Sequence, residues 1–161
     1  AGGYTLKLPT EDVRLKTRSQ FLADLSVMLG GYAAEDFVFH DISTGASNDL
    51  KEASALTRRL ITKYGMSRLG PVTFGNGDDP VFLGREIAMA KNYSENMASM
   101  IDEELNRITE AALLMTRKII SGKRKVLDAI AKSLIEKETL EQEDFYEIIK
   151  KFPFKPIAVS F

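Results

Sequence analysis

The chain has 161 residues, 44% of them apolar, and its 22 basic and 23 acidic residues give a formal net charge of −1. This length suffices for one domain with a substantial core, and the interspersed charges provide no overall positive field to attract nucleic acid or anionic lipid. The chain has no cysteine, which excludes disulfides, thiolate nucleophiles and cysteine-ligated metal sites and fits a reducing compartment.

The first predicted element is a short strand. Polar and apolar residues alternate from Tyr4 to Leu8, and Pro9 ends the pattern. A single strand needs a partner, and no pairing segment follows at hairpin distance. We therefore expect the partner strand in polypeptide preceding Ala1, which makes this segment the remnant of a small sheet.

Helical patterns follow. Thr17-x-x-Gln20 is a capping box that predicts the start of a helix. Gly30 and Gly31 interrupt its apolar stripe, so they either end this helix or allow another backbone to approach closely. The helical spacing of apolar residues then resumes over 32–39.

A further amphipathic helix is expected over residues 50–64, where the apolar positions again recur at helical spacing. Ser47 or Asn48 is the predicted N-cap, and Gly65 stands where a left-handed cap residue belongs. Residues 70–84 are rich in glycine and proline, which predicts a loop with short extended pieces at Val72–Phe74 and Val81–Leu83.

The C-terminal half contains three predicted helices. Ser94 caps a long one that ends near Gly122, a second spans 126–135, and Thr139-x-x-Gln142 caps the third. Short links favour antiparallel neighbours, so we expect a helical hairpin extended by one further helix, with the apolar stripes forming core. Together these elements predict a mainly α domain with a small β-strand or hairpin remnant.

Asp49 is the clearest candidate for a functional side chain. The small-residue segment Ser43–Asn48 delivers this carboxylate to the first turn of a helix. An acid there is favoured by the helix dipole by about 0.3–1 kcal/mol, so its presence has a purely structural explanation. A metal site would need further protein ligands, because catalytic zinc usually takes three. His40, the single histidine, offers one at most and also fits an ordinary surface residue.

Two other catalytic classes lack their motifs. Ser43, Ser47 and Ser67 have no G-x-S-x-G setting, and one histidine has no recognisable orienting carboxylate. The glycines are not followed by the Lys-Ser or Lys-Thr of a Walker phosphate loop, so we do not expect the chain alone to hydrolyse ATP.

Several sequence blocks nevertheless resemble the peptidase domain of the FtsH-type AAA-plus zinc metalloproteases, in order and in spacing, from Gly2 to about Lys150. The blocks are Gly2-Gly3-Tyr4-Thr5-Leu6, Leu29-Gly30-Gly31, Ala33-Ala34-Glu35, Ser43-Thr44-Gly45-Ala46-Ser47-Asn48-Asp49-Leu50, Tyr64-Gly65-Met66-Ser67, Phe82-Leu83-Gly84-Arg85 and Lys91-Asn92-Tyr93-Ser94.

This resemblance implies part of a membrane-anchored, hexameric, ATP-driven protease that degrades misfolded and short-lived proteins. It implies that Asp49 is the third zinc ligand. It also makes Glu35 a candidate for orienting a zinc-bound imidazole by accepting its other N–H, although Glu35 equally fits a solvated or ion-paired helix acid. The two histidine ligands and the glutamate base would lie on a His-Glu-x-Gly-His helix preceding Ala1. No catalytic residue is therefore assigned here, and the chain alone is expected to be inactive.

The resemblance also suggests how the chain is divided. Residues 1–92 would form the zinc-site half of the peptidase domain, 93–151 its C-terminal helical part, and 152–161 a tail. ATP would bind an ATPase domain outside this chain, membrane attachment would lie in other segments, and the domain would face the cytoplasm or an organellar interior. A different class remains open, namely a non-catalytic helical module for assembly.

Three residues depart from the family pattern, which commonly has arginine, glutamate and glycine at these positions. They are Tyr32, Asp36 and His40. Tyr32 removes a possible guanidinium partner for nearby carboxylates, and His40 adds an imidazole to the segment that leads to Asp49. Either change could alter metal affinity.

Overall fold

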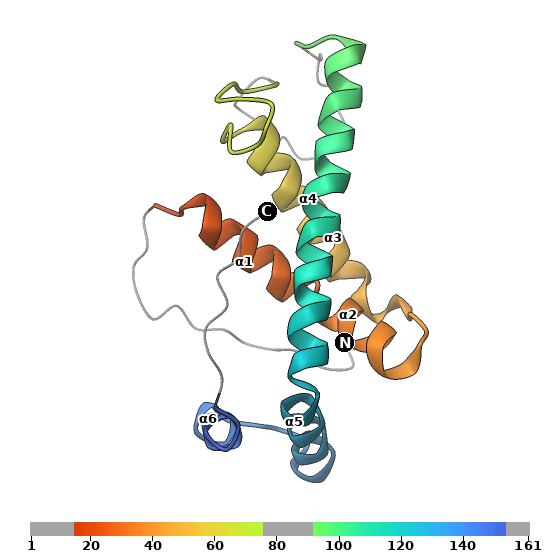
Figure 1. The fold of residues 1–161 in the computed structure, drawn as a ribbon, viewed down its shortest axis with the longest axis vertical. Coiled ribbons are helices and arrows are strands. Elements are labelled where there is room, and N and C mark those ends of the chain that lie inside the picture. Colours follow the sequence, from red (N-terminus) through yellow and green to blue (C-terminus); the bar gives the residue numbers. More distant parts are fainter. Residues whose placement is uncertain (1–14, 76–91, 154–161) are drawn as a thin grey trace, which may run out of the picture.

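The computed structural model describes residues 15–75 and 92–153. Within these ranges the chain forms six α-helices and one 3-10 helix, without a strand, which confirms a mainly α fold (Figure 1). The elements are α1 (Arg18–Met28), α2 (Gly30–Phe39), η1 (Thr44–Ala46), α3 (Ser47–Thr62), α4 (Glu95–Gly122), α5 (Arg124–Lys137) and α6 (Gln142–Lys150). The predicted strand Tyr4–Leu8 and the extended piece Val81–Leu83 lie outside the described residues. Val72–Phe74 is described but pairs with no strand there.

The predicted capping box at the start of α1 is confirmed. The Gln20 N–H donates to Thr17 Oγ1 at 3.3 Å, and the Thr17 N–H donates to Gln20 Oε1 at 2.7 Å. The first alternative for the glycine pair is confirmed, because α1 ends at Met28 with Leu29 as its C-cap, and Gly30 opens a separate helix, α2. The bend falls at Leu29, whose side chain is 1% exposed. Burial of that leucine in the core gives this bend a fixed position.

The predicted N-cap of α3 is wrong. Ser47 and Asn48 already lie inside the helix, and Ala46 is the N-cap, without a side-chain hydrogen bond. The single turn of η1 precedes α3, and Ser43 caps that turn by accepting the Gly45 N–H at 3.1 Å. The capping side chain is therefore Ser43, at the start of η1, and not a residue at the start of α3 as the local sequence predicts.

The left-handed residue expected after α3 is confirmed at Gly65, which has φ +60°. A Cβ on Gly65 would lie 3.1 Å from Pro71 Cα and 3.2 Å from the Val72 nitrogen, so the following loop packs directly against it. Both the backbone angle and this close approach call for glycine.

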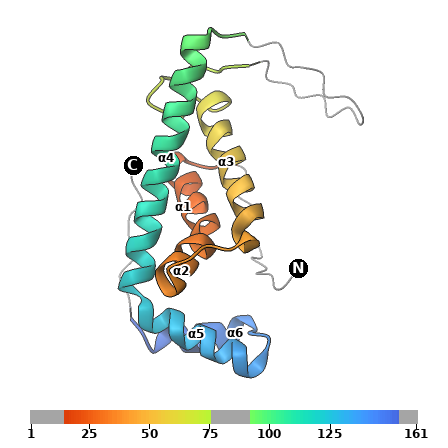
Figure 2. The same cartoon turned by 90° about the vertical axis from the view of Figure 1, so that its right-hand side faces the viewer.

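The core lies where α1, α3 and the long α4 meet, with α2 against the C-terminal half of α4 (Figure 2). Periodic apolar residues of these helices supply it, as the sequence predicts. The buried members are Leu22, Leu25, Leu29, Ala53, Leu56, Leu60, Ile61, Ile101, Ile108 and Ala112.

The C-terminal helices form, but their arrangement differs in part from the prediction. Ser94 caps α4 by accepting the Met97 N–H at 3.2 Å. Figure 2 shows α5 turning across the end of α4, and the neighbouring pair is α5 with α6. The α6 N-cap is Glu141 and not Thr139. Glu138, in the left-handed conformation at φ 63°, ends α5, and the next residues reverse the chain before α6 begins.

This turn leaves the α5–α6 pair apart from the main core. Neither helix contains a fully buried residue. Leu134 and Ile135, which the stripe predicts as core, are 41% and 82% exposed. Among the described helices, none is long and apolar enough to cross a membrane. Residues 154–161 of the predicted tail lie outside the described residues.

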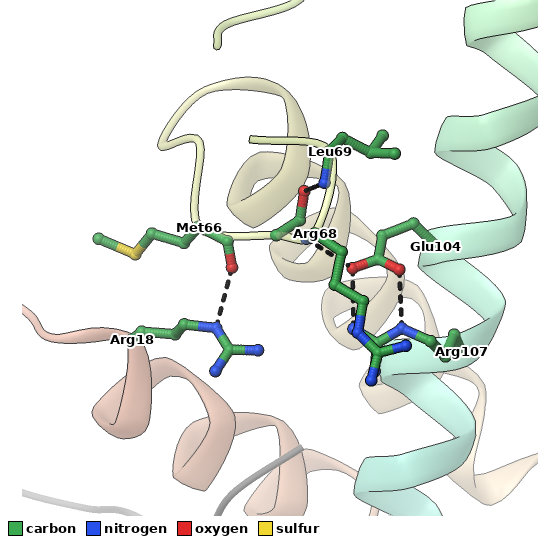
Figure 3. Close-up of polar contacts among 7 residues, drawn as sticks. Arg18, Met66, Arg68, Leu69, Glu104 and Arg107 are labelled. Atoms are coloured by element: carbon green, nitrogen blue, oxygen red, sulfur yellow. Dashed lines mark hydrogen bonds and ion pairs between the residues drawn. The ribbon is translucent and has the colours of Figure 1, made fainter. Parts of the chain in front are cut away.

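Glu104 joins α4 to the turn that follows α3 (Figure 3). Its side chain is 7% exposed and receives the Arg68 backbone N–H at 3.0 Å and the Arg107 Nε–H at 2.7 Å. Hydrogen bonding from the Arg107 guanidinium is the main cause that lowers the pKa of Glu104, and it outweighs the opposing effect of burial. The ionised carboxylate is therefore the form that the fold stabilises.

This ion pair predicts an acid-dependent loss of stability. Because the pKa of Glu104 is lowered in the folded state, its stabilisation is complete above the unfolded-state pKa and is lost as pH falls through the folded-state pKa. We expect Glu104→Gln to lower the free energy of unfolding by about 2 kcal/mol at pH 7, and by less below about pH 4. Urea unfolding across this pH range measures the difference. The matched control is Glu103→Gln, on the exposed face of α4; parallel pH curves for wild type and Glu104→Gln would contradict the expectation.

Candidate metal centre

Asp49 is the third residue of α3 and its first-turn acid. Its side chain is exposed. In the part of the chain that the structure describes, no hydrogen bond or ion pair engages its carboxylate. Asp49 Oδ2 lies 3.9 Å from the place that a Cβ of Gly31 would occupy, so it faces the beginning of α2. This is ordinary van der Waals contact with a side chain, and among the described residues no backbone atom of another segment lies within 4 Å of a Cβ built on Gly30 or Gly31, so the second alternative for the glycine pair, a close approach of another backbone, is wrong.

Glu35, on α2, fixes the segment that leads to Asp49. Its Oε2 accepts the Ser43 N–H at 2.9 Å, and its Oε1 accepts the Ser43 hydroxyl at 2.9 Å. A Cβ on Gly45 would lie 3.3 Å from Glu35 Oε1, which leaves little room for a larger residue in this turn. Glu35 therefore holds the turn before α3 in place, a contact across eight residues that sequence reasoning missed.

This contact predicts the effect of changing Glu35. Glu35→Gln replaces an acceptor oxygen by an NH₂ group and should break part of the Ser43 pairing, which costs about 1 kcal/mol of stability. The more specific result is faster hydrogen exchange at the Ser43 and Gly45 amides, measured by NMR, with the core amides of α3 unchanged. The control is Glu52→Gln, an exposed acid on α3. Unaltered exchange at Ser43 would show that the turn does not depend on Glu35.

His40 and Asp36 lie at the other end of α2. His40 is the left-handed C-cap residue at φ 53°, its N–H donates to the Asp36 carbonyl at 3.1 Å, and its side chain is exposed. The Asp36 carboxylate pairs with Arg117 of α4 at 2.8 Å. A hollow of about 370 Å³ is lined by Asp36, Phe37, His40, Leu114, Arg117, Lys118 and Ser121. Two cations line it, so its electrostatics do not favour a metal cation.

The donor set can be tested for its fit to zinc. Over residues 15–75 and 92–153, no group of three or more histidine, cysteine, aspartate or glutamate side chains could hold a metal ion. Asp49 fits the role of a single oxygen ligand, because its carboxylate is exposed and engaged by no neighbour among those residues. Glu35 is occupied by Ser43. A complete site would therefore need donors in addition to these residues.

These features define a helical domain with an exposed carboxylate in the first turn of α3 that no neighbour engages among the described residues. Residues 1–148 match the sequence model described as Peptidase family M41, and the chain belongs to this family. Three relatives illustrate the match.

The first is the ATP-dependent zinc metalloprotease FtsH of Chloroflexus aggregans, which is 46% identical over all of this chain and 25% of its own length. FtsH 2 of Alkaliphilus metalliredigens is 45% identical over 90% of this chain and 21% of its own. FtsH 1 of Thermomicrobium roseum is 47% identical over 87% and 22%. The chain thus spans about a quarter of the length of these relatives, each of which is named an ATP-dependent zinc metalloprotease.

Proposed function

We propose that this chain forms part of a zinc metalloendopeptidase domain, in which Asp49 is the third protein ligand of the zinc ion. The observation that carries the proposal is the position of Asp49, an exposed carboxylate near the start of α3 that no neighbour engages among the described residues. Membership of the M41 family and the names of the relatives support zinc as the metal and peptide hydrolysis as the reaction.

The chain's own residues have separate roles in this proposal. Asp49 donates a carboxylate oxygen, and α3 holds it on a helix whose inner face is buried in the core. Glu35 fixes the preceding turn through Ser43, so it positions Asp49 through the backbone. This differs from the imidazole-orienting role inferred from the resemblance, although both roles would act on the same centre. When bound, zinc supplies Lewis acidity and an activated water.

The remaining parts of the machinery are proposed to lie outside these residues. Two histidine ligands and a glutamate base would come from polypeptide preceding Ala1. Residues 1–92 would form the zinc-site half of the domain and 93–151 its helical support. ATP hydrolysis, membrane attachment and a hexameric assembly would belong to the whole protein, with protein substrates and a domain facing the cytoplasm or an equivalent interior. The word "ATP-dependent" in the relatives' names supports the first of these.

Zinc binding by the chain as it stands tests the need for further ligands. One carboxylate cannot form the three-ligand site typical of catalytic zinc. We expect equilibrium dialysis of the 161-residue chain to find no tight stoichiometric zinc. A version that includes the preceding polypeptide should bind one zinc per chain and cleave a peptide. Tight stoichiometric binding by the 161-residue chain, unchanged in the Asp49→Asn variant, would overturn the proposal.

A further inference from the structure

The helices α5 and α6, with the turn between them, form a unit over residues 124–150 that we call the C-terminal arm. Beyond Thr116 of α4, none of the residues that the structure describes, 117–153, is buried. The side chains that pack against the core cluster also end before the arm, since the last of them among the described residues is Leu113. Figure 2 shows the arm lying across the end of α4, outside the core. The core therefore holds the arm through very little buried surface.

The ion pairs of the C-terminal arm join its residues to one another. Within the part of the chain that the structure describes, they lie inside α5, inside α6, or between the two helices, where Lys137 pairs with Asp144 at 2.8 Å. Toward the core, the Arg124 guanidinium carbon lies 5.5 Å from the centre of the Phe37 ring of α2. An exposed contact of this kind is weak, and Arg124 also pairs with Asp128 of its own helix at 2.7 Å. The arm is thus tied more firmly within itself than to the core.

A single residue, Lys123, joins α4 to the arm. It is both the C-cap of α4 and the N-cap of α5, and its side chain does not cap α5 by a hydrogen bond. The last residue of α4, Gly122, is not left-handed, and a Cβ there would meet no other segment within 4 Å among the described residues. Neither a turn nor a close approach therefore requires this glycine, which weakens the end of the helix. Ser121 lines the hollow of about 370 Å³ between α2 and α4, so the end of α4 is not closely packed there.

From these observations we infer that the C-terminal arm moves as one body against the core, with a hinge at Gly122–Lys123 and the contact of Arg124 with Phe37 as its latch. Segments with few buried contacts open at a lower free energy than the core of the same domain. A hinge needs a few residues that can change their backbone angles, and glycine has the greatest freedom to do so. With the latch made, the arm has the position seen in Figure 2; with the latch broken, it takes other orientations. The inference does not depend on Asp49 or on zinc.

The test measures the distribution of distances between two spin labels, by double electron–electron resonance on the 161-residue chain. Because the chain has no cysteine, a pair of introduced cysteines is labelled alone. Glu52→Cys with Glu143→Cys reports from core to arm. The control pairs are Glu52→Cys with Glu103→Cys inside the core and Lys125→Cys with Glu143→Cys inside the arm, and all four positions are exposed. We expect the core-to-arm distribution to be at least roughly twice as wide as either control.

Two substitutions in the core-to-arm labelled chain test the hinge and the latch. Gly122→Ala adds a Cβ that has free space and favours the helix by a factor of about five, so the distribution should narrow. Phe37→Leu removes the ring beneath Arg124 and should widen the distribution. Phe39→Leu on the same helix is the matched control and should change nothing, because Phe39 is 72% exposed and no ring or cation contact engages it among the described residues. Circular dichroism checks that each labelled variant is folded.

Four results would overturn the inference. A core-to-arm distribution as narrow as the core control would mean that the arm is fixed. An equally wide distribution inside the arm would mean that α5 and α6 move separately and not as one body. An unchanged width in Gly122→Ala would remove the hinge from this junction. The same width in Phe37→Leu and Phe39→Leu would show that Arg124 and Phe37 form no latch.

Discussion

Replacing Asp49 by asparagine is expected to abolish zinc retention and peptide hydrolysis together, in a version of the protein that includes the polypeptide preceding Ala1. Loss of a group that merely orients a metal ligand typically costs 10–100-fold in affinity or activity. Loss of the ligand itself should therefore cost at least about 100-fold. Metal analysis after gel filtration and the rate of cleavage of a fluorogenic peptide measure the two effects on the same sample.

The matched control is Glu52→Gln. Glu52 is also an exposed acid of α3, three residues further along, so this change removes the same charge from the same helix. It should keep both zinc and activity. The helix-dipole explanation of Asp49 makes the opposite prediction, namely a stability loss of about 0.3–1 kcal/mol with zinc and activity retained. That outcome would remove Asp49 from the metal centre.

A large loss of stability is expected from Leu60→Ala. Leu60 is 1% exposed and belongs to the core cluster that α1, α3 and α4 share. Truncation removes buried methyl groups and leaves a cavity between helices that cannot collapse fully. The expected decrease in the free energy of unfolding is about 2–5 kcal/mol, measured by urea denaturation followed by circular dichroism.

The control for this prediction is Ile135→Ala on α5, because Ile135 is 82% exposed. Its effect should stay within about 0.5 kcal/mol, as is usual for surface positions. Similar losses for the two variants would mean that the α5–α6 pair is as well packed as the main core. Such a result would contradict the exposure of this helix pair.

The sequence predicts the helices well because their apolar residues recur at helical spacing and pack against one another. The capping box of Thr17 and the cap of Ser94 were also predictable, since each needs residues only three positions apart. The N-cap of α3 was not. Ser47 and Asn48 are good caps by type, but Ser43 forms its hydrogen bonds within the earlier turn, where Glu35 holds it.

Arrangements that depend on packing were the least predictable. The glycine pair predicts the end of α1, but the bend itself falls at Leu29, where a leucine enters the core. Likewise, a short link favours antiparallel helices, yet α5 turns away from α4 and leaves Leu134 and Ile135 exposed. Nothing in the pattern of α5 alone distinguishes a core-facing stripe from a stripe left on the surface.

The candidate site was likewise predictable where it depends on local sequence and not where it depends on tertiary contacts. Local sequence identifies Asp49 as a first-turn acid but leaves its purpose open, because the dipole and a metal both favour a carboxylate there. The role of Glu35 as the holder of the turn required the tertiary contact with Ser43. The Ser-x-Gly segment gave a weak signal for such a turn, without indicating its partner.

The most direct test of Asp49 as a zinc ligand is a crystal structure of the zinc-loaded protein with the polypeptide preceding Ala1 included. We expect one Asp49 carboxylate oxygen at about 2.0–2.2 Å from the zinc ion, beside two imidazole nitrogens. We also expect Glu35 still to accept hydrogen bonds from Ser43. A zinc ion held by other protein ligands, with the Asp49 carboxylate outside bonding distance, would contradict the assignment of Asp49 as a zinc ligand.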